Sequence, residues 1–87
     1  MSYPVDCFKA LGDIARFNIF MAIIQHPGKD RAYYTKWLQN KTSAWHHLQV
    51  LIQAELIHQD TIDARDVRYY PNKDKIVLIG CFFRGLE

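Results

Sequence analysis

The sequence contains no apolar run near the roughly 18 residues that a membrane-spanning helix needs. Its first residues, MSYPVDCFK, also lack the basic-then-apolar pattern of a secretory signal. There is no low-complexity segment and no internal repeat, so residues 1–87 are expected to form a single domain. These absences predict a cytoplasmic protein that does not enter a membrane.

Cysteine is scarce, because only Cys7 and Cys81 occur, near opposite ends of the chain. They form no C-x-x-C pair, and no group of histidines and cysteines has the spacing of a zinc site. A disulfide framework is therefore not expected, and we predict neither a bound metal nor another cofactor. No nucleophile and base, and no ligand set, occur at the spacing of a catalytic site, so we expect that the protein is not an enzyme.

The chain also has little excess of charge. Eleven Lys and Arg against nine Asp and Glu give a net charge of +2. Phosphate contacts usually come from a concentrated basic surface, so this total neither supports nor excludes DNA as a partner. Hydrophobic residues make up 49% of the chain, which is enough for a compact core. In so small a domain, a second subunit would cover apolar surface that one subunit leaves exposed.

Two helices are predicted in the N-terminal third of the chain. Val5 to Leu11 forms the first. Asp13 is placed to cap a second helix from Ile14 to Gln25-His26, which Pro27-Gly28 cannot continue. Apolar residues at i, i+3, i+4 and i+7 predict a buried stripe on this second helix. The stripe consists of Phe17, Phe20, Met21 and Ile24.

A third and a fourth helix follow, with the short turn between them that a helix-turn-helix motif requires. Arg31 to Gln39 forms the third helix, and its expected buried residues are Tyr34, Trp37 and Leu38. Asn40 caps the fourth helix, within the segment Asn40 to Leu56.

The fourth helix has two different faces when it is read at a period of 3.6 residues. One face is apolar and consists of Ala44, Leu48, Leu51 and Ile52. The remaining side chains can donate, accept or stack, and they are Thr42, Ser43, Trp45, His46 and Gln49. A short helix with one buried stripe and such side chains is suited to reading the major groove of DNA.

The C-terminal third predicts a hairpin and a last helix. Ile57 to Ile62 and Val67 to Tyr70 are two strands joined at a tip of four residues, and Pro71 ends the second strand. Lys73 to Leu86 also fits a strand, because it is apolar on every side, but Asn72 as cap favours a helix. We expect it to be buried, against either a second copy of itself or the first helix.

This order of elements predicts a mainly α (α+β) winged helix-turn-helix fold, with a two-stranded β-hairpin wing and a short C-terminal helix. Two stretches narrow the prediction. CFKALGDIARFNIF (Cys7 to Phe20) resembles the ALGD-x-x-R-x-x-I opening of the ArsR/SmtB family of bacterial repressors. TSAWHHLQVLIQAELI (Thr42 to Ile57) is similar to that family's recognition helix, which typically reads S-T-V-S-H-H-L-x-x-L-x-x-A-G-L-V. The two motifs occur in the family's order and spacing.

The resemblance implies a homodimer that binds operator DNA and is released by a metal or another inducer. Recognition residues carried onto this sequence lie on the fourth helix, and two arginines flank the tip of the wing, where minor groove or phosphates are in reach. The DNA-binding residues expected in this way are Lys41, Thr42, Ser43, Trp45, His46, Gln49, Arg65 and Arg68. Lys36 would add a contact to the DNA backbone.

The sequence also departs from the family. The family's metal-sensing cysteine pair would fall within Arg31 to Leu38, which contains no cysteine, and no histidine follows Pro71. Metal sensing is therefore disfavoured. Ile14 stands where a proline is common, and Glu55 stands where the family usually has glycine before Leu56.

Several residues admit more than one interpretation. Adjacent helical residues diverge by about 100°, so His46 and His47 are not expected to bind a metal, and His47 is expected to pack inward. Trp45 either belongs to the core or contacts DNA, and its burial distinguishes the two. By the resemblance, Cys7 and Cys81 lie near each other at a dimer interface, where they are either a redox pair or two buried apolar side chains.

The charges of the wing leave a similar choice. Arg65 and Arg68 lie among Asp60, Asp63 and Asp66, so the hairpin either contacts DNA or neutralises itself. The favoured function is a homodimeric, sequence-specific transcriptional regulator, most simply a repressor that binds an inverted repeat. The alternative is a winged helix that binds another protein.

Overall fold

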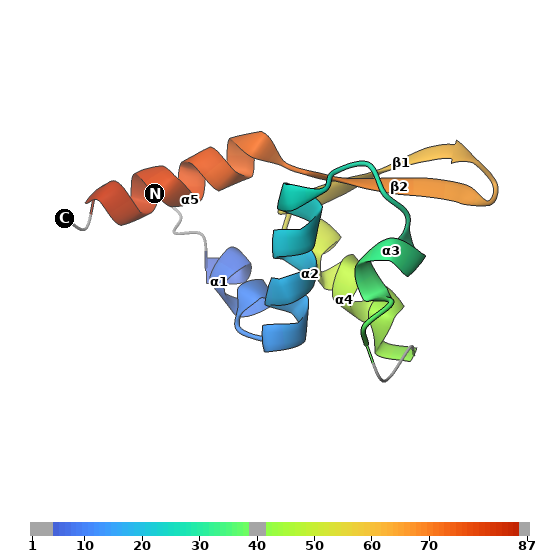
Figure 1. The fold of residues 1–87 in the computed structure, drawn as a ribbon. Helices are drawn as coiled ribbons and strands as arrows, with labels where there is room; N and C mark the ends of the chain where they lie inside the picture. The colour runs from blue at the N-terminus through green and yellow to red at the C-terminus, as the bar shows by residue number, and fades with distance from the viewer. Residues whose placement is uncertain (1–4, 39–41, 86–87) are drawn as a thin grey trace.

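The computed structural model describes residues 5–38 and 42–85, and the side chains of residues 7–38 and 43–80. Within these ranges, five helices and one β-hairpin follow one another (Figure 1). Their bounds are α1 (Val5–Leu11), α2 (Ile14–Gln25), α3 (Arg31–Thr35), α4 (Thr42–Gln53), β1 (Ile57–Asp63), β2 (Asp66–Pro71) and α5 (Lys73–Gly85). This order confirms the predicted winged helix-turn-helix fold with its hairpin wing and C-terminal helix.

The ends of α2 lie where local chemistry places them. The carboxylate of Asp13 accepts a hydrogen bond from the backbone N–H of Arg16 (3.1 Å), and this bond lowers the pKa of Asp13. Beyond the other end, Gly28 has a φ of 85°, in the left-handed region, and a Cβ there would lie 3.3 Å from the ring of Tyr70. The predicted cap and the predicted stop are both confirmed.

The prediction for the buried side of α2 is wrong in part. Phe17 and Ile24 are exposed, and Met21 is half-buried. The buried side chains are Ile19, Phe20 and Ile23. Apolar residues occur on more than one side of this helix, and Ile19, Phe20 and Ile23 also share one helical face. Packing against α1 and α4 decides which stripe faces inward.

Helix α3 is shorter than predicted, because it ends at Thr35 and not at Gln39. The hydroxyl of Thr35 donates to the carbonyl oxygen of Arg31 (2.7 Å), and the backbone N–H of Leu38 bonds to the carbonyl oxygen of Thr35 (3.0 Å). These bonds tighten the chain into a turn at the end of a run with modest helix propensity. Trp37 is consequently 44% exposed, contrary to the prediction, while Tyr34 is fully buried as expected. Asn40, the predicted cap of α4, lies outside the described residues.

The hairpin is attached to the helical body along β2. Strands β1 and β2 pair antiparallel, with Gln59 opposite Tyr69. On its other edge, Tyr69 accepts from the backbone N–H of Gly28 (2.8 Å) and donates to the carbonyl oxygen of Lys29 (3.1 Å). The α2–α3 loop therefore fixes the base of the wing, while β1 beyond Ile57 is exposed. Both strands match the prediction to within one residue at each end.

The turn from α4 into β1 carries an unusual backbone conformation. Glu55 has a φ of 62°, the left-handed conformation that favours glycine at this place after a helix. The side-chain amide of Asn72 donates to the carbonyl oxygen of Glu55 (2.8 Å), and Lys75 pairs with its carboxylate (3.3 Å). The departure from the family's glycine thus falls at a position that needs a left-handed residue, and contacts from the start of α5 hold it.

Helix α5 confirms the helical interpretation of the last segment. Asn72 accepts a hydrogen bond from the backbone N–H of Lys75 (3.4 Å), as a cap does. The helix then runs past α1 at the end of the molecule farthest from the wing tip (Figure 1). Ile76 and Ile79 pack against the core, but Val77 and Leu78 are 63% and 52% exposed. Within one chain, α5 is therefore covered on one face only, and burial of Val77 and Leu78 against a second copy stays a prediction.

The core lies between α1, α2, α4 and the base of the hairpin, and Tyr34 adds the contribution of α3. Its fully buried side chains are Cys7, Ile19, Ile23, Tyr34, Leu48, Leu51 and Leu56. These residues hold α4 and the wing on one scaffold, which fixes where the surface residues of both can reach.

Candidate nucleic-acid interface

One face of helix α4 packs against the core, and the other face is exposed to solvent. Ala44, Leu48 and Leu51 are buried and Ile52 is half-buried, as the periodicity predicts. His46 is exposed and Gln49 is half-buried. Ser43 is half-buried, and the side chain of Thr42 and the whole of Lys41 lie outside the described residues.

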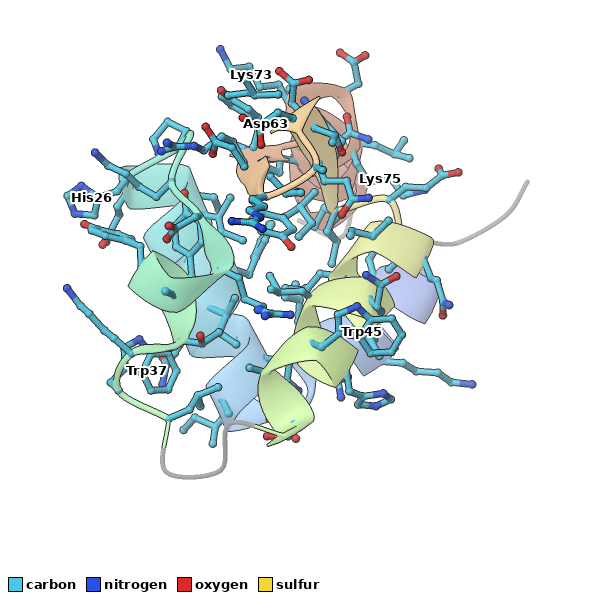
Figure 2. The ribbon with its side chains drawn as sticks, turned by 90° about the vertical axis from the view of Figure 1, so that its right-hand side faces the viewer. His26, Trp37, Trp45, Asp63, Lys73 and Lys75 are labelled. Atoms are coloured by element: carbon cyan, nitrogen blue, oxygen red, sulfur yellow. The ribbon has the colours of Figure 1, made fainter. Side chains whose placement is uncertain are left out.

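Trp45 stands on the open side of α4, and its side chain is 57% exposed. In Figure 2 it projects from α4 on the side away from α3. The core interpretation of Trp45 is therefore wrong. A large aromatic side chain that one chain leaves uncovered is typical of a surface that binds a partner.

A groove of about 730 Å³ lies between α3, the start of α4 and the tip of the wing. Figure 2 looks onto this side of the molecule, with α3 and α4 on either side and the hairpin above. Its walls come from Thr35 on α3, Ala44 on α4, and Val67 and Tyr69 on β2. The charged side chains of the groove are Asp30, Arg31, Lys36 and Arg65.

Positive charge exceeds negative charge among the residues that line this groove, because three of them are cationic and one is a carboxylate. The ammonium group of Lys36 lies over the ring of Tyr33, 4.7 Å from its centre. The carboxylate of Asp30 already accepts the backbone N–H of Tyr33 (3.0 Å) as the cap of α3. Lys36 was expected near DNA from the sequence and lines the groove. Arg31 was missed, because nothing in its local pattern distinguishes it from a solvated residue at the start of a helix. The modest charge of the whole chain hides this local excess.

The two arginines of the wing have different surroundings. Arg65 is exposed at the tip and lines the groove, and its backbone N–H donates to the carboxylate of Asp63 (2.8 Å). Arg68 is half-buried, pairs with Asp66 (2.6 Å) and donates to the carbonyl oxygen of Gly28 (3.3 Å). The Asp66 carboxylate raises the pKa of Arg68. The charge of Arg68 is therefore neutralised within the hairpin by Asp66, whereas Arg65 is the wing arginine that lines the groove.

His47 points inward and His46 points outward, as predicted. His47 is 8% exposed, and its Nδ1 accepts a hydrogen bond from Nε of Arg16 (3.4 Å) on α2. Burial lowers the pKa of His47. The two imidazoles lie 6.1 Å apart between ring centres. Among residues with described side chains, no group of three or more His, Cys, Asp or Glu is arranged to hold a metal ion.

Comparison of the chain with models of known protein families and with curated proteins found no match. A solved structure named "ArsR-like Transcriptional Regulator from Rhodococcus sp. RHA1" is similar to it, with a TM-score of 0.67 over 93% of this chain and 82% of that chain. The chain has an ArsR-like winged-helix fold. At 18% identity the similarity establishes the fold, so the function is argued from the site.

Within the ArsR-like fold, Cys7 lies in α1 and Cys81 in α5. Cys7 is buried, and its thiol donates to the carbonyl oxygen of Ala54 (3.5 Å). The side chain of Cys81 lies outside the described residues, so the redox pair stays a prediction. Over the part of the chain that the structure describes, no helix is long and apolar enough to cross a membrane.

Proposed function

We propose that the chain is a sequence-specific regulator of transcription that binds double-stranded DNA. The observation that carries the proposal is the basic groove between α3, the start of α4 and the wing. A phosphodiester strand fits a groove with three cations, while Trp45, His46 and Gln49 stand on the helix that enters the major groove. Phosphate contacts in the groove fix the register, and the α4 side chains read base edges.

The same proposal includes a homodimer that binds an inverted repeat and represses transcription. Two copies of α4 would then enter successive major grooves, with half-sites about 10–10.5 bp apart or a multiple of this. Support for the dimer comes from α5, whose outer face leaves Val77 and Leu78 exposed on a helix at one end of the molecule. A second copy would cover this face.

A second candidate function is a winged helix that binds another protein. The exposed Trp45 and the pairing of Arg68 with Asp66 favour it. A gel shift with duplex DNA across a salt series separates the two functions. A DNA-binding protein loses affinity steeply as salt rises, whereas binding that is weak at every salt concentration favours the protein-binding alternative.

Replacing Gln49 with alanine is expected to relax sequence preference at one base pair. The side-chain amide can bond adenine through two contacts, and the loss should cost about 1–3 kcal/mol at that position. The measurement is competition binding, with duplexes that carry single base-pair changes in a site selected from a random pool. Gln53→Ala, on the last turn of the same helix, is the matched control. If Gln53→Ala changes the preference and Gln49→Ala does not, the assignment of the reading surface is wrong.

Replacing Leu78 with aspartate is expected to raise the dissociation constant of the dimer at least about 100-fold. Burial of a leucine contributes about 1.5–3 kcal/mol, and a two-fold interface counts each substitution twice. Sedimentation at several protein concentrations measures the change. Ile62→Asp is the control, because Ile62 is also an exposed apolar residue (60%) but lies on β1 and not on α5. A Leu78→Asp variant that stays dimeric would remove α5 from the interface.

A further inference from the structure

Arg16 joins α1, α2 and α4 through one side chain. Its Nη1 donates to the carbonyl oxygen of Ala10 at the end of α1 (3.1 Å). Its Nε donates to Nδ1 of His47 on α4 (3.4 Å). Its backbone N–H is held by Asp13, so the start of α2 is fixed as well. A guanidinium can make both side-chain bonds at once because its donors form a rigid planar fork.

The bond to His47 exists in only one protonation state of the imidazole. Nδ1 must carry a lone pair to accept from Arg16, so the ring is neutral with its proton on Nε2. Protonation at Nδ1 would place one N–H against another and a cation beside the guanidinium. His47 is 8% exposed, so water cannot replace the lost bond without movement of the ring or of the helix.

The charged groups around His47 have opposing effects. From α2, Asp13 favours the protonated ring and Arg16 opposes it, and His46 on α4 itself also opposes it. From α1, Lys9 lines the same hollow as Arg16. Burial has the largest effect and disfavours the charged ring. The carboxylate of Asp13 is already bonded to the backbone of α2, which limits its approach to an imidazolium.

His47 also lies within the part of α4 that carries the proposed reading residues. Trp45 and His46 precede it on the same turn, and Gln49 follows two residues later. Because α4 is one rigid helix, a displacement of α4 that separates a charged His47 from Arg16 moves these three side chains with it. The contact with Arg16 therefore sets where the reading residues stand relative to the basic groove.

We propose that Arg16 and His47 are positioning residues for the DNA-reading surface of α4, and that loss of their bond in acid weakens DNA binding. The inference rests on the proposed function. If the inference holds, the affinity for DNA depends on pH through His47, a buried side chain that does not contact DNA.

The sign of the pH effect follows from proton linkage. If the DNA complex requires neutral His47, binding releases a proton in acid, and affinity falls as the pH drops through the pKa of His47 in the free protein. Burial lowers that pKa from 6.5, so the loss occurs below pH 6.5. The free energy of unfolding falls in the same range, because the unfolded chain binds this proton more readily. Binding must therefore be measured where circular dichroism shows folded protein.

The test compares DNA affinity from pH 8 to pH 5 at constant salt. For the parent protein, the dissociation constant should rise below pH 6.5 by up to about tenfold per pH unit for each subunit bound. His47→Asn keeps an amide oxygen as acceptor but does not titrate, so its profile should be flatter in acid. Arg16→Lys keeps the charge but lacks the planar set of guanidinium donors. This variant should therefore bind DNA more weakly at pH 8, and its affinity should change less as the pH falls. His58→Gln, at an exposed histidine of β1, is the control and should follow the parent.

A second measurement needs no DNA. In NMR spectra of the free protein, amide shifts of α4 should change with the same midpoint as the His47 ring, and should not do so in His47→Asn. Failure of the parent to bind DNA at any pH would contradict the proposed function and leave this NMR test of the positioning pair intact. The inference would be overturned by equal pH profiles of DNA affinity for the parent and His47→Asn. It would also be overturned if the amide shifts of α4 did not change as His47 is protonated.

Discussion

Reversing the charges of Arg31 and Arg65 together is expected to raise the dissociation constant for duplex DNA at least about 100-fold at low salt. The two side chains come from α3 and from the wing tip and line the same groove. After substitution with glutamate, the groove would hold one cation and three carboxylates. Each charged hydrogen bond to phosphate contributes about 1.5–3 kcal/mol, so the loss of two contacts accounts for a change of this size. Arg65→Glu alone should have a smaller effect in the same direction.

The salt dependence gives a second readout of the same variant. Each lost phosphate contact should lower the slope of log affinity against log salt by about 0.9. The control is Lys9→Glu on α1 with Lys73→Glu on α5, which changes the net charge equally at residues that do not line the groove. A similar loss in both double variants would mean that overall charge, and not the groove, determines affinity. A groove variant with the slope of the parent would exclude phosphate contacts from Arg31 and Arg65.

Much of the fold follows from short-range features of the sequence. Asp13 as a cap, Pro27-Gly28 as a stop and Asn72 as the cap of α5 each act within a few residues, and the structure confirms all three. The strands of the wing were equally predictable, because turn residues separate two β-branched and aromatic runs. The apolar face of α4 was predictable too, since only one of its sides is apolar.

Features that depend on contacts between distant segments were not predictable. Helix α2 offers two apolar stripes, and neighbouring elements choose between them. The groove joins α3 to a wing tip about 30 residues later in the chain, so Arg31 and Arg65 share no local pattern. Arg16 and His47 both belong to the motifs that suggested the fold, yet periodicity alone does not show that they bond to each other.

Tyr34 connects α2, α3 and the wing through both its ring and its hydroxyl group. It is fully buried, and its ring packs edge-on against Tyr33 and Tyr69. Its hydroxyl donates to the carbonyl oxygen of His26 (2.5 Å) and accepts from the backbone N–H of Lys29 (3.0 Å). Burial raises the pKa of Tyr34 above its ordinary value, so the hydroxyl keeps its proton and stays a donor at neutral pH.

Replacing Tyr34 with alanine is expected to lower the free energy of unfolding by about 3–5 kcal/mol, because a buried aromatic ring leaves a cavity. Small domains have about 5–15 kcal/mol in total, so this variant should be largely unfolded at modest denaturant concentrations. Tyr34→Phe keeps the ring and leaves the groups of His26 and Lys29 without their partner, at a cost of about 1–3 kcal/mol. Urea unfolding at one fixed protein concentration measures both changes, since dimerisation makes stability depend on concentration.

Tyr33→Phe is the matched control for the hydroxyl, because the neighbouring Tyr33 is only half-buried. Its effect should stay within about 0.5 kcal/mol, as for most substitutions near the surface. Equal effects of Tyr34→Phe and Tyr33→Phe would show that packing of the ring, and not the two hydrogen bonds, holds the α2–α3 loop. Because that loop pairs with β2, loss of the hydroxyl should also loosen the wing. Amide exchange at Tyr69 should then quicken in Tyr34→Phe and not in the control.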